Sequence, residues 1–214
     1  MLKIAVFSQK GGAGKSTLAV HVAVAAARSM QVILIDADPQ GTVVSWAQDR
    51  QAVDPFVARV EPSSITQLLE GATSEGFELA VIDCPPHAAP GTTALLRAAD
   101  HVVIPCQPTM PDLSATARSV ALARSAGRGY SFVVNRAPAR APEVMQAIEA
   151  LGGGGRVAPI VIGDRRAYSR ALTDGRAVTE FAPSGSKAAD EINGYWDWLY
   201  EHVKEQAWQT QQAA

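Results

Sequence analysis

Short apolar runs alternate with longer helical stretches along most of the chain. The runs cover residues 4–7, 32–35, 79–82 and 101–105, and the stretches between them include 15–29, 42–50 and 92–99. Continuous apolar runs are typical of strands buried on both faces, and strands that alternate with helices predict a parallel sheet. We therefore expect an α/β fold with a mostly parallel twisted sheet and helices on both faces.

The rest of the chain continues this alternation. Further strands are expected over 56–60 and 130–135, and further helices over 65–71, 114–125, 142–151 and 186–207. Asp112 and Ser114 are the candidate caps of helix 114–125, because their side-chain oxygens can accept the free N–H groups of a first turn. The chain has 214 residues, 47% of them hydrophobic, and can bury one sizeable core. We expect a single domain over 1–208 and a polar tail over 209–214.

A glycine-rich segment directly follows the first apolar run. Residues 10–17 read Lys-Gly-Gly-Ala-Gly-Lys-Ser-Thr. A strand, a glycine-rich loop and a helix N-terminus together bring several backbone N–H groups onto phosphate oxygens. Lys15 can reach the β- and γ-phosphates of a nucleotide, and the Ser16 hydroxyl can bind Mg²⁺. The residues expected to bind the nucleotide here are Gly11, Gly12, Ala13, Gly14, Lys15, Ser16 and Thr17.

The loop departs from the usual phosphate-binding pattern at one position. The pattern Gly-x-x-x-x-Gly-Lys-Ser/Thr would place its first glycine at residue 9, but that residue is Gln9 and a lysine, Lys10, follows it. Two lysines, Lys10 and Lys15, are therefore expected around one triphosphate.

Carboxylates stand at the ends of two apolar runs. Asp36 and Asp38 follow the run 32–35, and Asp83 follows the run 79–82. Open α/β sheets bind ligands at the carboxyl ends of their strands. Asp83 is the expected Walker B acid that holds Mg²⁺, while Asp36 and Asp38 share one face of an extended chain and can point toward the metal and the γ-phosphate. A helix cap or a turn is the alternative role for either of these two aspartates alone.

These motifs resemble the ParA/MinD family of deviant Walker P-loop ATPases, and most of all the small ParA partition ATPases. The matching segments are residues 10–17, Asp-Ala-Asp-Pro-Gln-Gly at 36–41 and Val-Ile-Asp-Cys-Pro-Pro at 81–86. The resemblance implies a homodimer that sandwiches ATP and Mg²⁺ and hydrolyses ATP to ADP and phosphate. In that dimer Lys10 would cross to the partner's phosphates, Asp38 would orient the attacking water, and Asp36 would lie near the metal with Ser16 and Asp83.

The base and DNA contacts are less strongly indicated. Asn135 follows an apolar run, where an amide can pair with an adenine edge, and the resemblance adds the loop near Pro159; a hydrogen-bonded strand-end Asn is an equal alternative. The resemblance also implies nonspecific DNA binding through basic residues of the C-terminal region. A solvated charged face is the alternative, because the net charge of −2 gives DNA binding no bulk support. The candidate DNA contacts are Arg165, Arg166, Arg170 and Lys187.

Two further features bear on cofactors and location. Cys84 and Cys106 are expected to be small buried thiols, with a dimer-bridging iron–sulfur cluster as the alternative. The start of the chain leads straight into a strand, without a signal peptide, and no apolar run reaches the ~20 residues that span a bilayer. We therefore expect a cytoplasmic protein, associated with the nucleoid when ATP is bound.

The C-terminal helix is expected to pack on the sheet. Its apolar stripe is Ile192, Tyr195, Trp196, Leu199, Val203 and Ala207. Its polar positions are mostly acidic, whereas helices that bind membrane surfaces usually carry Lys and Arg there. No membrane partner is therefore expected.

The sequence leads to one main function and several alternatives. The main expectation is a ParA-type ATPase that partitions plasmid or chromosomal DNA and is stimulated by a ParB-like partner. Alternatives within the family are a cargo-positioning ATPase, for chemoreceptor clusters or carboxysomes, and a MinD-like membrane switch. An ATP-dependent ligase of the dethiobiotin-synthetase type is the alternative from a different class, but it leaves Lys10 and the Asp-Ala-Asp-Pro-Gln segment unexplained.

Overall fold

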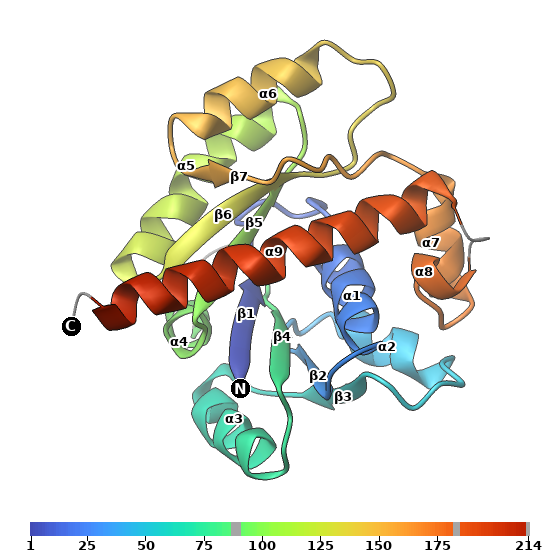
Figure 1. The fold of residues 1–214 in the computed structure, drawn as a ribbon, viewed down its shortest axis with the longest axis vertical. Coiled ribbons are helices and arrows are strands. Elements are labelled where there is room, and N and C mark those ends of the chain that lie inside the picture. The colour runs from blue at the N-terminus through green and yellow to red at the C-terminus, as the bar shows by residue number, and fades with distance from the viewer. Residues whose placement is uncertain (87–90, 182–184, 213–214) are drawn as a thin grey trace.

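A seven-stranded parallel sheet forms the centre of the protein (Figure 1). The computed structural model describes residues 1–86, 91–181 and 185–212, with side chains up to Gln206. The strands lie in the order β3 (Phe56–Arg59), β2 (Val32–Asp36), β4 (Leu79–Asp83), β1 (Leu2–Val6), β5 (His101–Cys106), β6 (Gly129–Val134) and β7 (Arg156–Val157), and every pair is parallel. The predicted α/β fold is confirmed.

Helices cover both faces of the sheet. One face carries α1 (Lys15–Ala26), α2 (Thr42–Gln48), α7 (Arg166–Thr173), α8 (Val178–Phe181) and α9 (Lys187–Gln212). The other carries α3 (Ile65–Ser74) with a 3₁₀ turn before it (Pro62–Ser64), α4 (Thr92–Ala98), α5 (Met110–Ser125) and α6 (Glu143–Gly152). In Figure 1, α9 runs obliquely across the sheet, and α7 and α8 lie beside its N-terminal end.

Each central strand contributes side chains to two hydrophobic cores, one on each face of the sheet, because successive side chains of a strand point to opposite faces. In β1, Ile4 and Val6 pack with α1 and α9, whereas Ala5 and the next residue, Phe7, pack with α4 and α5. This is why the strands read as unbroken apolar runs. The same register places Val6, Asp36 and Asp83 side by side at the carboxyl ends of β1, β2 and β4.

Most predicted elements are present, but α5 begins earlier than expected. It starts at Met110, and its N-cap is Thr109, whose hydroxyl oxygen accepts the Asp112 N–H at 3.4 Å. The prediction that Asp112 or Ser114 caps this helix is therefore wrong. Pro111 suits a first turn, because its fixed φ fits the helix and its missing N–H costs nothing there.

The C-terminal helix also differs from its predicted length. It continues to Gln212, so residues 209–212 belong to the helix and do not form a separate tail; residues 213–214 lie outside the described part. The stripe Ile192, Tyr195, Trp196, Leu199 and Val203 is buried as predicted, and the side chain of Ala207 lies outside the described residues. No helix in the described ranges is long and apolar enough to cross a membrane.

Candidate nucleotide site

The loop between β1 and α1 has the backbone shape that a phosphate-binding loop requires. Gly12 and Gly14 adopt the left-handed region, with φ of +78° and +86°, and Gly14 is the N-cap of α1. Residues other than glycine rarely adopt this conformation. At position 14 a side chain would also collide with the amide of Asn135. The glycines of the segment therefore fix both its curvature and its approach to β6.

Three side chains that follow β5 and β6 hold this loop by its carbonyl groups. Gln107 donates a hydrogen bond from Nε2 to the Gly12 carbonyl at 2.8 Å, and Arg136 donates to the same oxygen at 3.3 Å. Asn135 donates from Nδ2 to the Ala13 carbonyl at 2.9 Å. Gln107 and Arg136 were not predicted to lie at the site, because nothing in their sequence positions pairs them with a loop 95 and 124 residues away.

Asn135 therefore has a structural role as a hydrogen-bonded residue at the end of a strand, which was the alternative to a contact with adenine. Its amide nitrogen is used by the loop, and its Oδ1 accepts the Arg136 N–H at 3.0 Å. Its contact with an adenine edge stays a prediction.

Lys15 projects from the first turn of α1 toward the strand ends. It is buried, and burial lowers the pKa of its ammonium group, while the carboxylates of Asp83 and Asp38 act in the opposite direction. The structure thus brings together Lys15 and two of the predicted acidic residues.

Asp36 and Asp83 are register partners on neighbouring strands, and both are fully buried. Asp36 accepts the backbone N–H of Asp38 at 3.1 Å through Oδ1 and that of Val44 at 2.9 Å through Oδ2. The second bond satisfies a free N–H in the first turn of α2, so Asp36 acts as a helix cap. This is the alternative role that the sequence left open for Asp36.

Asp83 has no comparable set of partners. Neither of its carboxylate oxygens receives a hydrogen bond of standard geometry from the described residues. Burial raises the pKa of this carboxyl to about 7, and the nearby Ser16 hydroxyl and Lys15 act in the opposite direction. A buried carboxylate without donors is costly unless a cation neutralises it.

These residues fit a bound Mg²⁺. Magnesium prefers carboxylate and hydroxyl oxygens, and Asp83 offers two oxygens without donors next to the Ser16 hydroxyl. Asp36 is a weaker candidate ligand, because both of its oxygens are engaged by backbone N–H groups.

Asp38 lies closer to the surface of the site and is still buried. Its Oδ1 accepts the Gln40 N–H at 3.0 Å, and no group in the described part of the chain donates to Oδ2. One carboxylate oxygen is therefore available to accept a hydrogen bond from water.

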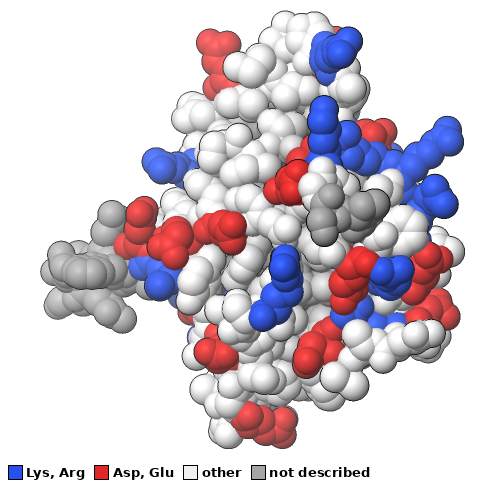
Figure 2. Space-filling model, turned by 45° about the vertical axis from the view of Figure 1, so that its right-hand side comes forward, with Lys and Arg blue, Asp and Glu red and all other residues white. Residues whose placement is uncertain are grey.

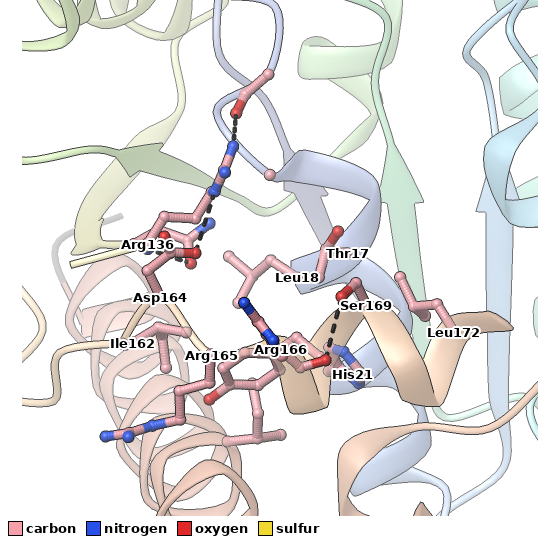
Figure 3. A pocket seen from close by; sticks show the side chains of 16 residues that line it. Thr17, Leu18, His21, Arg136, Ile162, Asp164, Arg165, Arg166, Ser169 and Leu172 are labelled. Atoms are coloured by element: carbon pink, nitrogen blue, oxygen red, sulfur yellow. Dashed lines mark hydrogen bonds and ion pairs between the residues drawn. The ribbon is translucent and has the colours of Figure 1, made fainter. Parts of the chain in front are cut away.

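A pocket of about 530 Å³ opens beside the phosphate loop (Figure 3). Its walls come from the loop and α1, the end of β6, the 162–166 segment, α7 and α9. The lining residues that bear on the argument are Gly14, Thr17, His21, Asn135, Asp164 and Arg166. Pro159, the predicted base contact, is exposed and does not line the pocket; the residues from Ile162 to Arg166 do so in its place.

The predicted DNA-binding residues separate into different environments. Arg165 points away from the pocket in Figure 3 and is paired with Glu191 of α9. Arg166 points into the pocket and forms no ion pair with any described residue. Arg170 and Lys187 are exposed. In Figure 2 acidic side chains lie directly beside the densest group of Lys and Arg, so the surface is mixed in charge and not uniformly basic.

Lys10 lies at the outer edge of the loop, with its side chain about one-third exposed. Its ammonium group pairs with the carboxylate of Asp112 in the first turn of α5. Asp112 itself is buried, with 2% of its surface exposed. The predicted role of Lys10 in a partner's site stays a prediction.

Both cysteines are buried in the core on the α4–α5 side of the sheet. Burial raises the pKa of the Cys84 and Cys106 thiols, which disfavours the thiolate form that metal clusters require. This environment fits the expected small buried thiols better than the iron–sulfur alternative.

A parallel sheet, a glycine-rich loop before a helix, a buried lysine and a buried aspartate at the neighbouring strand end define a P-loop nucleotide-binding protein. A family model described as the CobQ/CobB/MinD/ParA nucleotide binding domain matches residues 4–178. The chain belongs to this ParA/MinD family of P-loop ATPases.

Two curated relatives match nearly the whole chain. "Maintenance of carboxysome distribution protein A" from Gloeobacter kilaueensis is 31% identical, over 87% of this chain and 88% of the relative. The protein of the same name from Halothiobacillus neapolitanus is 29% identical, over 89% and 92%. The chromosome-partitioning ATPase Soj from Thermus thermophilus is 32% identical, over only 49% and 54%. The alternative of a cargo-positioning ATPase is thus supported better than the main expectation of DNA partition.

Solved structures agree on the fold. Apo McdA from "Cyanthece" has a TM-score of 0.78 at 18% identity, covering 93% of this chain and 99% of that one. MinD from Pyrococcus horikoshii, in complex with Mg-ADP, has a TM-score of 0.75 at 17% identity, covering 92% and 95%.

Proposed function

We propose that this protein is an ATP-driven positioning ATPase that forms an ATP-sandwich homodimer and distributes a large protein cargo inside the cell. The observation that carries the proposal is the full-length similarity to two carboxysome distribution proteins, combined with the presence of Lys10 before the phosphate loop. The cargo class is a protein compartment of the carboxysome kind.

The chain's own residues are assigned as follows. Backbone N–H groups of residues 11–17 and the Lys15 ammonium bind the phosphates, and Ser16 and Asp83 hold Mg²⁺. The ion, when bound, neutralises charge that develops on the β- and γ-phosphate oxygens. Asp38 orients water through its free Oδ2, and Lys10 supplies a cation to the γ-phosphate of the partner's nucleotide, much as an arginine finger does.

We propose that the dimer binds DNA nonspecifically and that DNA is the surface on which it moves. Arg170 and Lys187 are the supporting residues, since Arg165 is engaged by Glu191 and Arg166 points into the pocket. Two copies in a dimer would double the number of phosphate contacts, and DNA binding of this kind weakens steeply with salt. A partner protein that stimulates hydrolysis would then release the dimer from DNA.

Partition of plasmid or chromosomal DNA is the second candidate. The similarity to Soj over about half of the chain favours it, but that similarity covers less of this chain than the match to the positioning proteins.

Two experiments test the proposal. A DNA mobility shift with the Asp38→Ala variant should show binding with ATP, none with ADP, no sequence preference, and loss of binding at high salt. Deletion of the gene should disturb the spacing of a protein compartment and leave plasmid and chromosome inheritance unchanged. Normal compartment spacing with failed DNA inheritance would favour the second candidate. Absence of DNA binding with every nucleotide would contradict the proposal that the dimer moves on DNA.

A further inference from the structure

Lys10 has an intramolecular partner that its proposed role in trans does not require. Its ammonium group pairs with Asp112, whose carboxylate also accepts the Thr109 hydroxyl at 2.5 Å. Lys10 and Asp112 are 102 residues apart, so the pair is made by the tertiary fold. A lysine that must reach a second subunit is therefore held by its own chain.

The face of α5 that holds Lys10 is polar, although it is buried. Asp112, Thr116 and Ser119 are spaced as i, i+4 and i+7 and therefore share one helix face. They are 2%, 6% and 0% exposed. Ser119 accepts the Gln9 N–H at 3.0 Å, one residue before Lys10. This helix thus contacts the start of the phosphate loop at two points, through Ser119 and through Asp112.

Asp112 can keep its charge without Lys10. It lies in the first turn of α5, where free N–H groups and the helix dipole favour a carboxylate, and the Thr109 hydroxyl donates to it. Release of Lys10 therefore does not leave an isolated buried charge. Lys10 in turn would exchange one carboxylate for a triphosphate, which carries several negative charges and attracts it more strongly.

We propose that Asp112 is the internal counter-ion that withholds Lys10 in the monomer and yields it to nucleotide phosphate when two copies assemble. This inference rests on the proposed function, because it assumes that Lys10 acts across an ATP dimer. Asp112 acts through Lys10 and does not touch the nucleotide. Its effect is therefore to make the free energy of dimer assembly less favourable. ADP, which lacks the γ-phosphate, would not compete with Asp112 for Lys10.

The test uses the full chain and the Asp112→Asn variant, which keeps the size of the side chain and its acceptor oxygen. The first measurement is labelling of Lys10 by an amine-reactive reagent in the nucleotide-free monomer, read by mass spectrometry with Lys204 of the same molecule as reference. Loss of the ion pair should raise Lys10 labelling several-fold. Asp100→Asn, which removes the Lys3–Asp100 surface pair at the opposite ends of the strands, is the matched control and should leave Lys10 labelling unchanged.

The second measurement is the dimer dissociation constant with Mg²⁺ and a non-hydrolysable ATP analogue. Each dimer releases two lysines, so Asp112→Asn should tighten assembly by about tenfold, which corresponds to a change of about 1.4 kcal/mol. Affinity of the monomer for ADP should not change. Asp112→Ser serves as a second variant with the same expectation, and circular dichroism checks that both variants are folded.

The outcomes separate the inference from the proposed function. Unchanged labelling would show that the ion pair does not exist in solution and would overturn the inference. Raised labelling with unchanged or weaker assembly would also overturn it, because Asp112 would then not withhold Lys10. Failure of the unmodified protein to dimerise with the ATP analogue would overturn the proposed function instead, while the labelling result would still decide whether the pair exists.

Discussion

The carboxyl ends of β2 and β4 carry two buried aspartates that sit side by side and have opposite environments. Asp36 is satisfied by two backbone N–H groups, whereas Asp83 has no donor of standard geometry among the described residues. Both have the same side chain, the same strand position and no exposed surface. One carboxylate therefore stabilises the fold, while the other carries an uncompensated charge that is suited to a cation.

The largest effect is expected from removing Asp36. Asp36→Ala leaves two N–H groups without their acceptor and uncaps α2, so it should lower the free energy of unfolding by about 2–4 kcal/mol. Urea denaturation of the nucleotide-free protein measures this change. Asp49→Ala is the control, since Asp49 is exposed at the other end of α2 and its loss should cost less than about 0.5 kcal/mol. Equal effects at the two positions would contradict the capping role of Asp36.

Asp83→Asn should have the opposite sign. Without bound ion or nucleotide, replacing the unpaired carboxylate should raise the free energy of unfolding at pH 8 by about 1–3 kcal/mol. The pKa of Asp83 is raised to about 7 in the folded protein, so the ionised form costs stability as pH rises from about 4 through 7. The advantage of the variant should therefore shrink toward pH 5. Denaturation in EDTA at both pH values tests this, and a destabilised variant at pH 8 would break the contrast with Asp36.

Asn135→Ala should act on ligand affinity more than on the fold. Loss of the amide frees the Ala13 carbonyl and loosens the loop, so affinity for ATP should fall by about tenfold, or about 1.4 kcal/mol. Calorimetry with ATP and GTP separates the two roles of this residue. An equal loss for both nucleotides is expected if Asn135 positions the loop. A loss confined to ATP would show that it reads the adenine instead.

The smallest effect is expected at His101, a buried base whose pKa shifts in the direction opposite to that of the buried acid Asp83. Burial and the neighbouring His202 lower the pKa of His101 to about 4, so the unfolded chain takes up a proton at higher pH than the folded chain. Stability should therefore fall as pH drops from 6.5 toward 4. His101→Gln should remove about 1 kcal/mol of this loss at pH 5, as measured by urea denaturation across that range. An unchanged pH dependence would contradict the assignment.

The sequence predicted the sheet, the phosphate loop and the acidic strand ends because each is a local pattern. Apolar runs, glycines and the order strand–loop–helix involve only residues that are close together in the sequence. The contrast between Asp36 and Asp83 could not be predicted, since it depends on which backbone N–H groups α2 presents at its first turn. The place of Asp112 near a helix start predicts a capping role, whereas its partner Lys10 lies 102 residues away and is not suggested by any local pattern. The family resemblance places the base contact near Pro159, because the sequence does not show that residues 162–166 line the pocket.

The proposed cycle requires that ATP, and not ADP, joins two copies through the site built around Lys10, Lys15 and Asp83. Sedimentation velocity of the unmodified protein and of Lys10→Ala, with Mg²⁺ and either a non-hydrolysable ATP analogue or ADP, tests it most directly. We expect a dimer only for the unmodified protein with the ATP analogue, and monomers in the other three samples. A Lys10→Ala variant that dimerises as well as the unmodified protein, or an unmodified protein that stays monomeric with the analogue, would contradict it.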